Sequence, residues 1–444
     1  MKTVFLCGGI GKRMFPITED KFLLTFLGKP LLQSQLETAR QAGLKDFIII
    51  GNKFNVEQIE QIAGQVQNIK TKVVLQKQPR GIADALKSAA SFLDAETLIV
   101  NPNDVFAASA YSSLLQAAKK KSAGSYILGH TTKSYFPGGY LVINVAGELQ
   151  HIVEKPKPGK EPGNLINILL HFHSDAKRLL DYIERVKTTR DDVYECALDN
   201  LAGDGHKIRV VPYHDFWAPI KYPWHVFEVI RYLLDNSKSR ISRSASISSR
   251  ATIEGKVVIC DGVRVLENAV IRGPVYIGNG TLIGNNALVR DYSHIGADCV
   301  IGFGTEVKNS YIGDGCWAHS SYIGDSIVGK DCSFGAGTVL ANYRFDEQNV
   351  PVNMGAGEID SGRDKLGAII GDNCKTGINS SVMPGVRIGP DSIVGSQVCL
   401  MDDLGPGKMM QAEQRYVTQP NPAKPGEAKR AELKEKLRKL IPDK

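Results

Sequence analysis

The stretch VYIGNGTLIGNNALVRDYSHIGADCVIGFGTEV, residues 275–307, carries an aliphatic residue at every sixth position. This spacing covers eleven consecutive positions: Ile247, Ile253, Ile259, Val265, Ile271, Ile277, Ile283, Val289, Ile295, Ile301 and Val307. Such a repeat is typical of a β-helix in which each short strand forms one side of a triangular coil and turns its aliphatic residue inward. Glycine follows several of these residues and eases the turn at each corner. The stretch therefore predicts a left-handed parallel β-helix of hexapeptide repeats.

The six-residue spacing is interrupted once and then returns. It reappears at Ile370, Thr376, Val382, Ile388, Val394 and Leu400. Between the two runs, residues 342–368 do not follow the period and predict a loop ejected from the coil. Long loops on rigid scaffolds often carry function, so this loop is a candidate part of a site.

The first 236 residues have a different pattern, in which short β-rich runs alternate with amphipathic helical stretches. TVFLCGG, DFIIIGN and TLIVNPND are examples of the β-rich runs. Alternation of this kind predicts an α/β domain with a Rossmann-like, mostly parallel sheet. Ligands bind outside the carboxyl ends of the strands in such sheets, where both the glycine loop and NPND fall.

Length and composition bound the remaining possibilities. With 444 residues we expect domains at 1–236, 237–410 and 411–444, the last a basic and helical tail. A solvated helix explains this tail better than nucleic-acid or membrane binding does. No apolar run approaches ~20 residues, which argues against membrane insertion. The eight cysteines include no CxxC pair, so we expect free thiols and a cytoplasmic location.

Two features together indicate a family. The N-terminal half resembles the sugar-phosphate nucleotidylyltransferases, and the C-terminal half resembles a hexapeptide-repeat acyltransferase. Their fusion resembles the bifunctional GlmU type, especially its archaeal-style relatives. The resemblance implies acetylation of glucosamine 1-phosphate by acetyl-CoA and uridylyl transfer from UTP, which gives UDP-N-acetylglucosamine and pyrophosphate.

The glycine loop LCGGIGKRMFPITEDKFLL, residues 6–24, resembles the family's phosphate-binding opening. The resemblance implies that Gly8 and Gly9 lie at the nucleotide and that Arg13 and Lys21 are the catalytic cations contacting its phosphates. Several residues of this half of the chain differ from those of the family pattern: Lys12, Asp20, Ile82, Asn103, Leu169 and Pro219.

Further segments resemble the family's base-reading and sugar-binding runs. In LQKQPRGIADAL, Gln76 is implied to face the uracil edge, and Gly81 to allow close backbone approach. Gly139 is implied to supply a backbone contact, Glu154 to accept sugar hydroxyls, and Asn167 to touch the sugar.

The implied metal site has one ligand in place and one replaced. Asp104 corresponds to the family's Mg²⁺ ligand, whereas Pro219 stands where the family has a second metal-binding aspartate. Proline offers no side-chain ligand. Because Mg²⁺ often uses only one or two carboxylates together with phosphates and waters, we expect Asp104 alone to bind the metal at reduced affinity. Lys221 lies two residues on and is an alternative source of positive charge.

The segment GTEVKNSYIGDGCWAHSSYIGDSIVGKDCSFGAGTVLANYRFDE, residues 304–347, closely resembles the family's acetyltransferase core. Acetyl transfer to an amine needs a base, donors for the developing oxyanion and cations for the sugar phosphate. His319 falls on the family's general-base histidine, and imidazole suits that task because its pKa lies near neutrality.

The other implied residues of this half bind the sugar phosphate and acetyl-CoA. Arg290 and Lys308 are eighteen residues apart, three repeats of six, and we expect them on one face of the coil. The resemblance implies an acetyl-CoA contact at Ala336. It also implies sugar-site roles for Tyr322, Ser333, Asn342, Tyr343 and Lys365. Ser333 replaces a family asparagine, and Ile378 replaces a serine near the CoA.

Three functions remain open on the sequence. The first is the bifunctional enzyme, with a nucleoside triphosphate, a sugar 1-phosphate and acetyl-CoA as substrates. The second keeps acetyl transfer alone, with a degenerate nucleotidyltransferase domain. The third is a non-catalytic regulatory or scaffold subunit of the same architecture. UTP is favoured over dTTP, the choice between glucosamine and galactosamine stays open, and the family's assembly implies a homotrimer.

Overall fold

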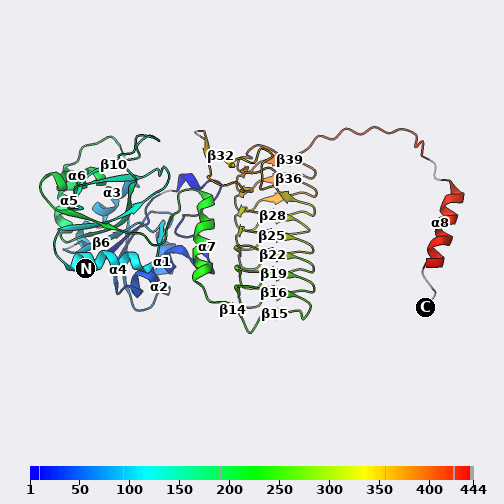
Figure 1. Ribbon diagram of the computed structural model, residues 1–444, viewed down its shortest axis with the longest axis horizontal. Helices are drawn as coiled ribbons and strands as arrows, with labels where there is room; N and C mark the ends of the chain where they lie inside the picture. The colour runs from blue at the N-terminus through cyan, green and yellow to red at the C-terminus, as the bar shows by residue number, and fades with distance from the viewer. Residues whose placement is uncertain (10, 94, 191, 356, 424–425, 441–444) are drawn as a thin grey trace. The chain divides into compact units, whose positions relative to one another are not determined.

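The computed structural model describes residues 1–440 except 10, 94, 191, 356 and 424–425, and it leaves the side chain of Lys12 undescribed. The chain forms two compact units, Met1–Met410 and Gln411–Lys444. Within the first unit an α/β part precedes a long stack of short parallel strands (Figure 1). The second unit contains helix α8 (Glu427–Leu440), which has no buried residue.

The α/β part is built on a nine-stranded sheet. Its parallel core has the order β6 (Thr97–Val100), β1 (Lys2–Leu6), β4 (Asp46–Gly51) and β5 (Lys70–Leu75). Beyond β6, the strand β11 (Leu165–His173) runs antiparallel and begins a second set of strands. That set contains β8 (Ser125–Thr131), β9 (Gly139–Ile143), β10 (Leu149–Glu154) and β12 (Ile208–Pro212). The Rossmann-like fold is confirmed, and the antiparallel strands extend its sheet.

Helices cover both faces of this sheet because each has one apolar side. One buried cluster includes residues of α1 (Leu31–Gln41), α2 (Val56–Gln65) and α4 (Ala108–Lys119). The opposite cluster includes residues of α3 (Gly81–Ser88), α5 (Ala176–Arg185) and α6 (Val193–Gly203). Two small two-stranded sheets join β2 (Thr25–Phe26) to β3 (Lys29–Pro30), and β7 (Asp104–Phe106) to β13 (Trp217–Pro219).

The predicted left-handed β-helix is confirmed, and its strands form three parallel sheets, here called faces 1, 2 and 3. Face 1 contains β14 (Arg240–Ile241), β17 (Val257–Ile259), β20 (Val275–Ile277), β23 (Ser293–Ile295), β26 (Tyr311–Ile312), β29 (Ile327–Val328), β34 (Ile369–Ile370) and β37 (Arg387–Ile388). Face 2 contains β15 (Ser246–Ile247), β18 (Arg264–Val265), β21 (Leu282–Ile283), β24 (Val300–Ile301), β27 (Trp317–Ala318), β30 (Ser333–Phe334), β35 (Lys375–Thr376), β38 (Ile393–Val394) and β40 (Met409–Met410). Face 3 contains β16 (Thr252–Glu254), β19 (Val270–Arg272), β22 (Leu288–Arg290), β25 (Glu306–Lys308), β28 (Tyr322–Gly324), β31 (Val339–Leu340), β36 (Ser381–Val382) and β39 (Cys399–Leu400).

The coil continues through residues 308–341, where the six-residue spacing fails. Inward positions there are filled by buried Ile312, Ala318, Ile323, Val328 and Phe334. Some of these are only five residues apart, because the corners between them are one residue shorter. The coil from Glu306 to its register partner Tyr322 therefore takes 16 residues, against 18 for the coil from Leu288 to Glu306. All eight cysteines of the chain are free.

The loop ejected between β31 and β34 folds back on the α/β part. It carries the hairpin of β32 (Pro351–Asn353) and β33 (Glu358–Asp360). Val350, Val352 and Leu366 are buried in one cluster with residues of α7 (Val226–Asn236). Figure 1 shows α7 alongside the β-helix. The loop thus joins the two halves of this unit.

Face 1 of the β-helix packs against the β2–β3 hairpin through an aromatic stack. His294 stacks between Tyr276 and Tyr311, with ring centroids 4.8 and 5.0 Å apart. Phe26 contacts Tyr311, with a centroid separation of 5.9 Å. The N–H of Leu27 donates to Nε2 of His294 at 3.1 Å. A neutral imidazole is required at this contact, since Nε2 must accept.

Stability is expected to fall as the pH is lowered from 7.5 to 5. Burial lowers the pKa of His294 to about 4, below the unfolded value of about 6.5. Between these values the unfolded chain binds the proton first, so stability is lost as pH falls, by about 3 kcal/mol at full effect for this residue. Thermal unfolding of the wild type and of His294→Phe, at both pH values, measures the effect. The variant should lose less stability than the wild type, and equal losses would contradict the assignment.

Candidate active sites

The loop after β1 borders a cavity at the carboxyl end of the parallel strands. The cavity measures about 190 Å³, and its lining includes Gly8, Gly9, Gln76, Gly81 and Ile82. A neighbouring cavity of about 130 Å³ is lined by Gly9, Lys21 and Asn103 among others. Because Gly9 and Asn103 border both cavities, the predicted base-reading and phosphate-binding residues lie along one continuous surface.

Gln76 is held by the protein and has no free amide hydrogen for a base. Its Nε2 donates to the carbonyl of Gly81 at 3.2 Å and to Oδ2 of Asp84 at 2.8 Å. Its Oε1 lies against Gly8, where an added Cβ would approach it to 1.9 Å. The side chain therefore offers a ligand only its Oε1, and a side chain at position 8 would displace this amide.

Three predicted residues of the phosphate site influence one another electrostatically. The pKa of Lys21 is lowered to about 8, first by burial and then by the charge of Arg13, while the charge of Asp104 opposes the shift. Burial also raises the pKa of the Asp104 carboxyl, and the charges of Lys221 and Lys21 oppose that shift. The structure thus places a buried carboxylate among cations, an arrangement suited to polyanionic phosphates.

Asp104 is fixed by neutral donors as well. Nδ2 of Asn101 donates to one carboxylate oxygen at 2.9 Å, and Nε1 of Trp217 donates to the other at 3.3 Å. Pro219 is its direct partner in the antiparallel pairing of β13 with β7. Side chains of directly opposed residues lie on the same face, so Pro219 occupies the place from which a second carboxylate would face Asp104.

Lys221, which the sequence suggested as an alternative source of positive charge, lies close to Asp104 and Glu154. Its pKa is lowered to about 7, mainly by burial, and the charges of Asp104 and Glu154 oppose this shift. Its Nζ donates to the carbonyl of Pro137 at 2.6 Å and lies 3.5 Å from the ring centroid of Phe136. Its position between two carboxylates depends on the turn after β13, which no local sequence pattern encodes.

The oxygen atoms at and beside Asp104 fit as ligands of a divalent cation that takes its other ligands from phosphates and waters. Among the described residues, no group of three or more His, Cys, Asp and Glu side chains forms a metal cluster. However, the buried Oδ1 of Asn103 has no hydrogen-bond partner in the described part of the chain. One carboxylate and one unpartnered amide oxygen match the sparse protein ligation that Mg²⁺ accepts at phosphate sites.

The predicted sugar residues converge at the start of β9. Gly139 pairs with Glu154 across β9 and β10. A Cβ at Gly139 would lie 3.0 Å from Oε2 of Glu154 and 3.6 Å from Cβ of Asn167. Glu154 also lines a cavity of about 120 Å³ together with Gly81, Ile82 and Tyr194. The absence of a side chain at Gly139 lets Glu154 and Asn167 approach this backbone closely.

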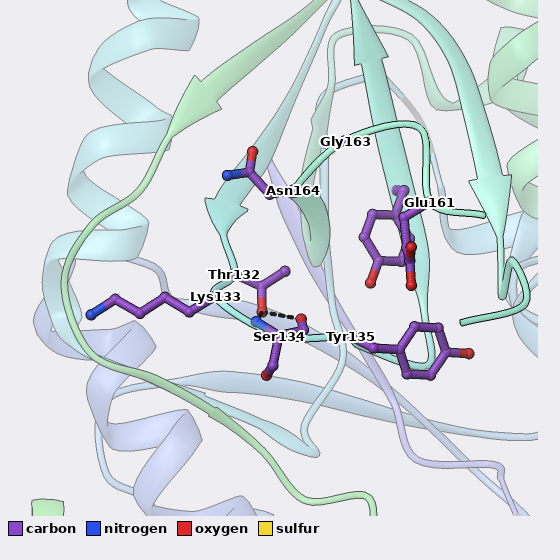
Figure 2. Close-up of a pocket in the computed structure, with 8 residues that line it drawn as sticks. Thr132, Lys133, Ser134, Tyr135, Glu161, Gly163 and Asn164 are labelled. Atoms are coloured by element: carbon purple, nitrogen blue, oxygen red, sulfur yellow. Dashed lines mark hydrogen bonds between the residues drawn. The ribbon is translucent and has the colours of Figure 1, made fainter. Parts of the chain in front are cut away.

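A separate polar cavity of about 220 Å³ lies between the segment after β8 and the segment before β11 (Figure 2). Its lining includes Thr132, Tyr135, Tyr140 and Glu161. Hydroxyl Oγ1 of Thr132 donates to the carbonyl of Ser134 at 2.8 Å. None of the predicted site residues lines this cavity, so it lies outside the two candidate sites.

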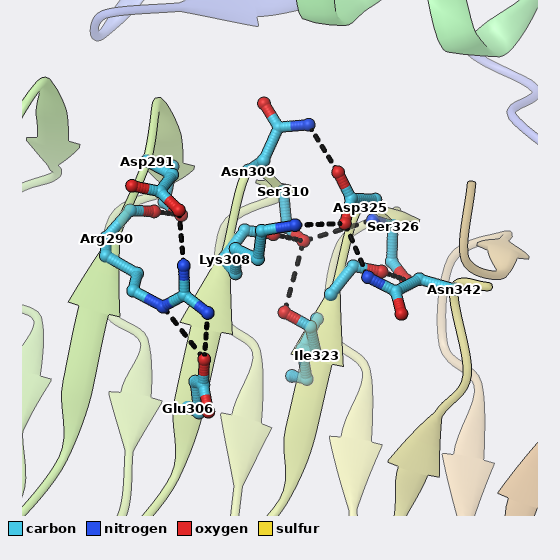
Figure 3. Close-up of polar contacts among 12 residues, drawn as sticks. Arg290, Asp291, Glu306, Lys308, Asn309, Ser310, Ile323, Asp325, Ser326 and Asn342 are labelled. Carbon is cyan, nitrogen blue, oxygen red and sulfur yellow. Dashed lines mark hydrogen bonds and ion pairs between the residues drawn. The ribbon is translucent and has the colours of Figure 1, made fainter. Parts of the chain in front are cut away.

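The predicted cations of the acetyl-transfer site stack on face 3. Arg290 and Lys308 are register partners at the ends of β22 and β25. Nη2 of Arg290 contacts Glu306 at 2.8 Å, and Nη1 contacts Asp291. Nζ of Lys308 contacts Oδ2 of Asp325 at 3.0 Å. Figure 3 shows both cations at one edge of the face, which is the corner between faces 3 and 1.

Asp325 organises this corner, although the sequence did not single it out. Its side chain is 4% exposed. Besides Lys308 it accepts Nδ2 of Asn309 at 2.7 Å and Nδ2 of Asn342 at 2.5 Å (Figure 3). Nδ2 of Asn342 also donates to the hydroxyl of Tyr322 at 3.2 Å. The buried carboxylate therefore brings the first residue of the ejected loop next to Lys308.

His319 lies at a different corner, between faces 2 and 3. It follows β27, its side chain is exposed, and its backbone N–H donates to the carbonyl of Phe334 at 3.1 Å. Tyr322 begins the next strand, β28, on face 3. Within the described chain His319 makes no side-chain hydrogen bond to the cation corner. The base and the cations thus border face 3 from opposite edges.

The remaining predicted residues divide between these two corners. Ser333 begins β30 on face 2 and pairs with Trp317, and Ala336 follows that strand. Tyr343 and Lys365 pair in an isolated bridge, with Nζ of Lys365 5.7 Å from the centroid of the Tyr343 ring. Ser333 and Ala336 therefore belong to the side of His319, whereas Tyr343 and Lys365 belong to the ejected loop beside Asn342.

Comparison with known proteins places both halves of the chain. The sequence pattern of nucleotidyl transferases matches residues 2–217, and that of the bacterial transferase hexapeptide (six repeats) matches residues 274–309 and 367–400. A bifunctional sugar-1-phosphate nucleotidylyltransferase/acetyltransferase of Sulfurisphaera tokodaii is 34% identical over 93% of this chain and 100% of its own length.

The chain belongs to this bifunctional family. Relatives named bifunctional protein GlmU support the assignment. The one from Methanococcus maripaludis is 38% identical over 91% of this chain and 95% of its own length. The one from Methanocaldococcus jannaschii is 33% identical over 90% of this chain and 95% of its own length. The GlmU-type resemblance is confirmed, and the chain is a transferase that combines nucleotidyl transfer with acetyl transfer. The two alternatives, acetyl transfer alone and a non-catalytic subunit, are not favoured. In this GlmU-type chain, none of the described helices is long and apolar enough to cross a membrane.

Proposed function

We propose that the chain acetylates an amino-sugar 1-phosphate, glucosamine 1-phosphate being favoured, with acetyl-CoA on its β-helix. It then transfers uridylyl from UTP to the product on its α/β domain. The single observation that carries this proposal is that one chain has both a phosphate-type surface, with Lys21 near buried Asp104, and a cation corner on the same β-helix as His319.

In the nucleotidyl-transfer half, Lys21 and Arg13 would contact the triphosphate while the cavity beside Gly8 and Gln76 takes the base. Asp104, with Asn103, would hold Mg²⁺, which neutralises phosphate charge when it is bound. Glu154 and Asn167 would bind the sugar at Gly139.

In the acetyl-transfer half, Arg290 and Lys308 would bind the sugar phosphate, and His319 would accept the proton of the amine as it attacks the thioester carbonyl. Tyr322, on face 3, accepts a hydrogen bond from Asn342 of the cation corner and so connects the two edges. Ser333, Tyr343 and Lys365 would border the sugar, and Ala336 would contact acetyl-CoA. Exposed apolar side chains at or next to the corner between faces 2 and 3 that carries His319, among them Phe303, Trp317 and Ile378, support the proposed homotrimer, in which a neighbouring copy covers this corner.

Substrate panels test each half separately. Purified protein with acetyl-CoA should release free thiol with glucosamine 1-phosphate and less with galactosamine 1-phosphate. With N-acetylglucosamine 1-phosphate and Mg²⁺ it should release pyrophosphate from UTP and less from dTTP. Absence of thiol release with every amino-sugar 1-phosphate would reject the acetyl-transfer half. Absence of pyrophosphate with every combination would reject the nucleotidyl-transfer half.

Pro219→Asp is expected to lower the Mg²⁺ concentration required for half-maximal pyrophosphate release by about tenfold, since a second carboxylate would then face Asp104. Titration of Mg²⁺ with the wild type, Pro219→Asp and Pro219→Ala measures this effect. The alanine variant removes the proline without adding a ligand and should behave like the wild type. The same Mg²⁺ requirement in all three would show that no metal lies between these positions.

A further inference from the structure

A continuous chain of hydrogen bonds runs behind the proposed sugar pocket, from β11 through α6 to the turn before β12. Its members contact one another in the following order: Asn167 Oδ1 to His171 Nε2 at 2.8 Å, His171 Nδ1 to the Tyr194 hydroxyl at 2.8 Å, that hydroxyl to His173 Nε2 at 3.2 Å, His173 Nδ1 to Ser125 Oγ at 2.9 Å, and Ser125 Oγ to His206 Nε2 at 3.1 Å. The family resemblance assigned a role only to the first of these residues.

The centre of this chain is buried and uncharged. His171, His173 and Tyr194 are at most 1% exposed. Burial lowers the pKa of His171 well below its usual range and that of His173 to about 3, so both imidazoles are neutral at pH 7. The rings of His171 and Tyr194 also stack, with centroids 5.7 Å apart. A neutral imidazole has one donor nitrogen and one acceptor nitrogen, which constrains the direction of every bond in the chain.

The direction follows from the end at Asn167. Because Oδ1 can only accept, Nε2 of His171 carries the proton and Nδ1 must accept from the Tyr194 hydroxyl. That hydroxyl then accepts from Nε2–H of His173, whose Nδ1 accepts from Ser125. Ser125 in turn accepts from His206. Each internal member donates once and accepts once, so turning the Asn167 amide over would require every bond to reverse.

This fixed direction leaves one polar group of Asn167 for a ligand. Its Nδ2 has no protein partner in the described part of the chain, while its Cβ lies near Gly139 and Glu154, where the sugar is proposed to bind. Tyr194 is therefore connected to the sugar position through His171 and Asn167, although it also borders the cavity that contains Glu154.

We propose that Tyr194 is a positioning residue of the nucleotidyl-transfer site, which acts through His171 to hold the Asn167 amide with its Nδ2 donors toward the sugar. The site thereby selects sugar 1-phosphates that present an oxygen acceptor to Asn167. This inference rests on the proposed function of the α/β domain and assigns a cause to its sugar recognition.

Steady-state kinetics of the full-length protein test the relay. Tyr194→Phe keeps the stacked ring but removes the hydroxyl. We expect it to raise the KM for N-acetylglucosamine 1-phosphate about tenfold, because a tenfold change corresponds to the free energy of about one hydrogen bond. Both kcat and the KM for UTP should stay within about twofold of the wild type. Tyr182→Phe is a matched control, because its hydroxyl donates to Asp204 at 2.6 Å, outside this chain. It should leave the KM for the sugar 1-phosphate unchanged.

A double-mutant cycle separates action through Asn167 from direct contact. If Tyr194 acts through Asn167, the double variant Tyr194→Phe/Asn167→Ala should have the same KM for the sugar 1-phosphate as Asn167→Ala alone. Additive effects, or an unchanged KM in Tyr194→Phe, would overturn the inference while leaving the proposed function intact.

The imidazole ¹⁵N spectrum gives a readout that does not depend on activity. His171 and His173 should both be in the Nε2–H tautomer in the wild type. In Tyr194→Phe the ¹⁵N signal of His171 Nδ1 should shift, because that nitrogen loses the hydroxyl from which it accepts. An Nδ1–H tautomer at either residue would overturn the relay. If the wild type released no pyrophosphate, the proposed function would fail, and the tautomers would still decide whether the relay exists.

Discussion

His319→Ala should lower the rate of acetyl transfer by roughly 10²- to 10⁴-fold, as removal of a general base does. The imidazole is exposed at the corner between faces 2 and 3 and makes no side-chain hydrogen bond within the described chain, so the coil should fold without it. Release of free thiol from acetyl-CoA measures the rate, and pyrophosphate release by the same protein should stay unchanged.

A second histidine provides the control for this variant. His214 is also exposed but lies in the α/β part, so His214→Ala should leave thiol release at the wild-type rate. If His319→Ala also retained that rate, the assignment of the base would be wrong. Recovery of part of the lost rate at higher pH, where the amine loses its proton without help, would support the assignment.

Asp104→Asn should lower the rate of pyrophosphate release by on the order of 10²-fold or more. The substitution removes the buried negative charge that lies near the cations expected to bind the phosphates. The amide has nearly the same shape as the carboxylate and keeps one acceptor oxygen for Asn101, giving up the longer bond from Trp217. Burial raises the pKa of Asp104, so removing the charge also removes a cost of burial. The variant should therefore fold, and its acetyl transfer should match the wild type.

Asp46→Asn is the matched control for this charge removal. Asp46 pairs with Lys2 at 2.8 Å, and both side chains remain partly exposed. Surface pairs contribute little, so this variant should keep its pyrophosphate release. If Asp104→Asn kept full pyrophosphate release across a range of Mg²⁺ concentrations, the assignment of Asp104 to the nucleotidyl-transfer site would be wrong.

The β-helix could be predicted from the sequence because each inward position requires an aliphatic residue at a fixed spacing. The eighteen-residue separation of Arg290 and Lys308 likewise predicted a common face, since one full coil returns the chain to the same side. The coils through Ile312, Ile323 and Val328 could not be predicted from the period, because shortened corners change the spacing while the inward side chains stay buried.

Contacts between distant segments account for what the sequence did not predict. Asp325 collects donors from Lys308 and from Asn342, the first residue of the ejected loop, and no local pattern marks it. Gln76 was expected to face a base, yet Asp84 and Gly81 hold both of its amide hydrogens. Lys221 approaches Asp104 only because β13 pairs with β7.

The central claim is that one chain carries two working sites that act in sequence. The most direct measurement incubates the purified full-length protein with acetyl-CoA, glucosamine 1-phosphate, UTP and Mg²⁺, and follows free thiol, pyrophosphate and the nucleotide sugar by mass spectrometry. We predict thiol and pyrophosphate release together with formation of UDP-N-acetylglucosamine, and loss of that product in both His319→Ala and Asp104→Asn. Thiol release without pyrophosphate, or pyrophosphate without thiol, would contradict the claim of two active sites.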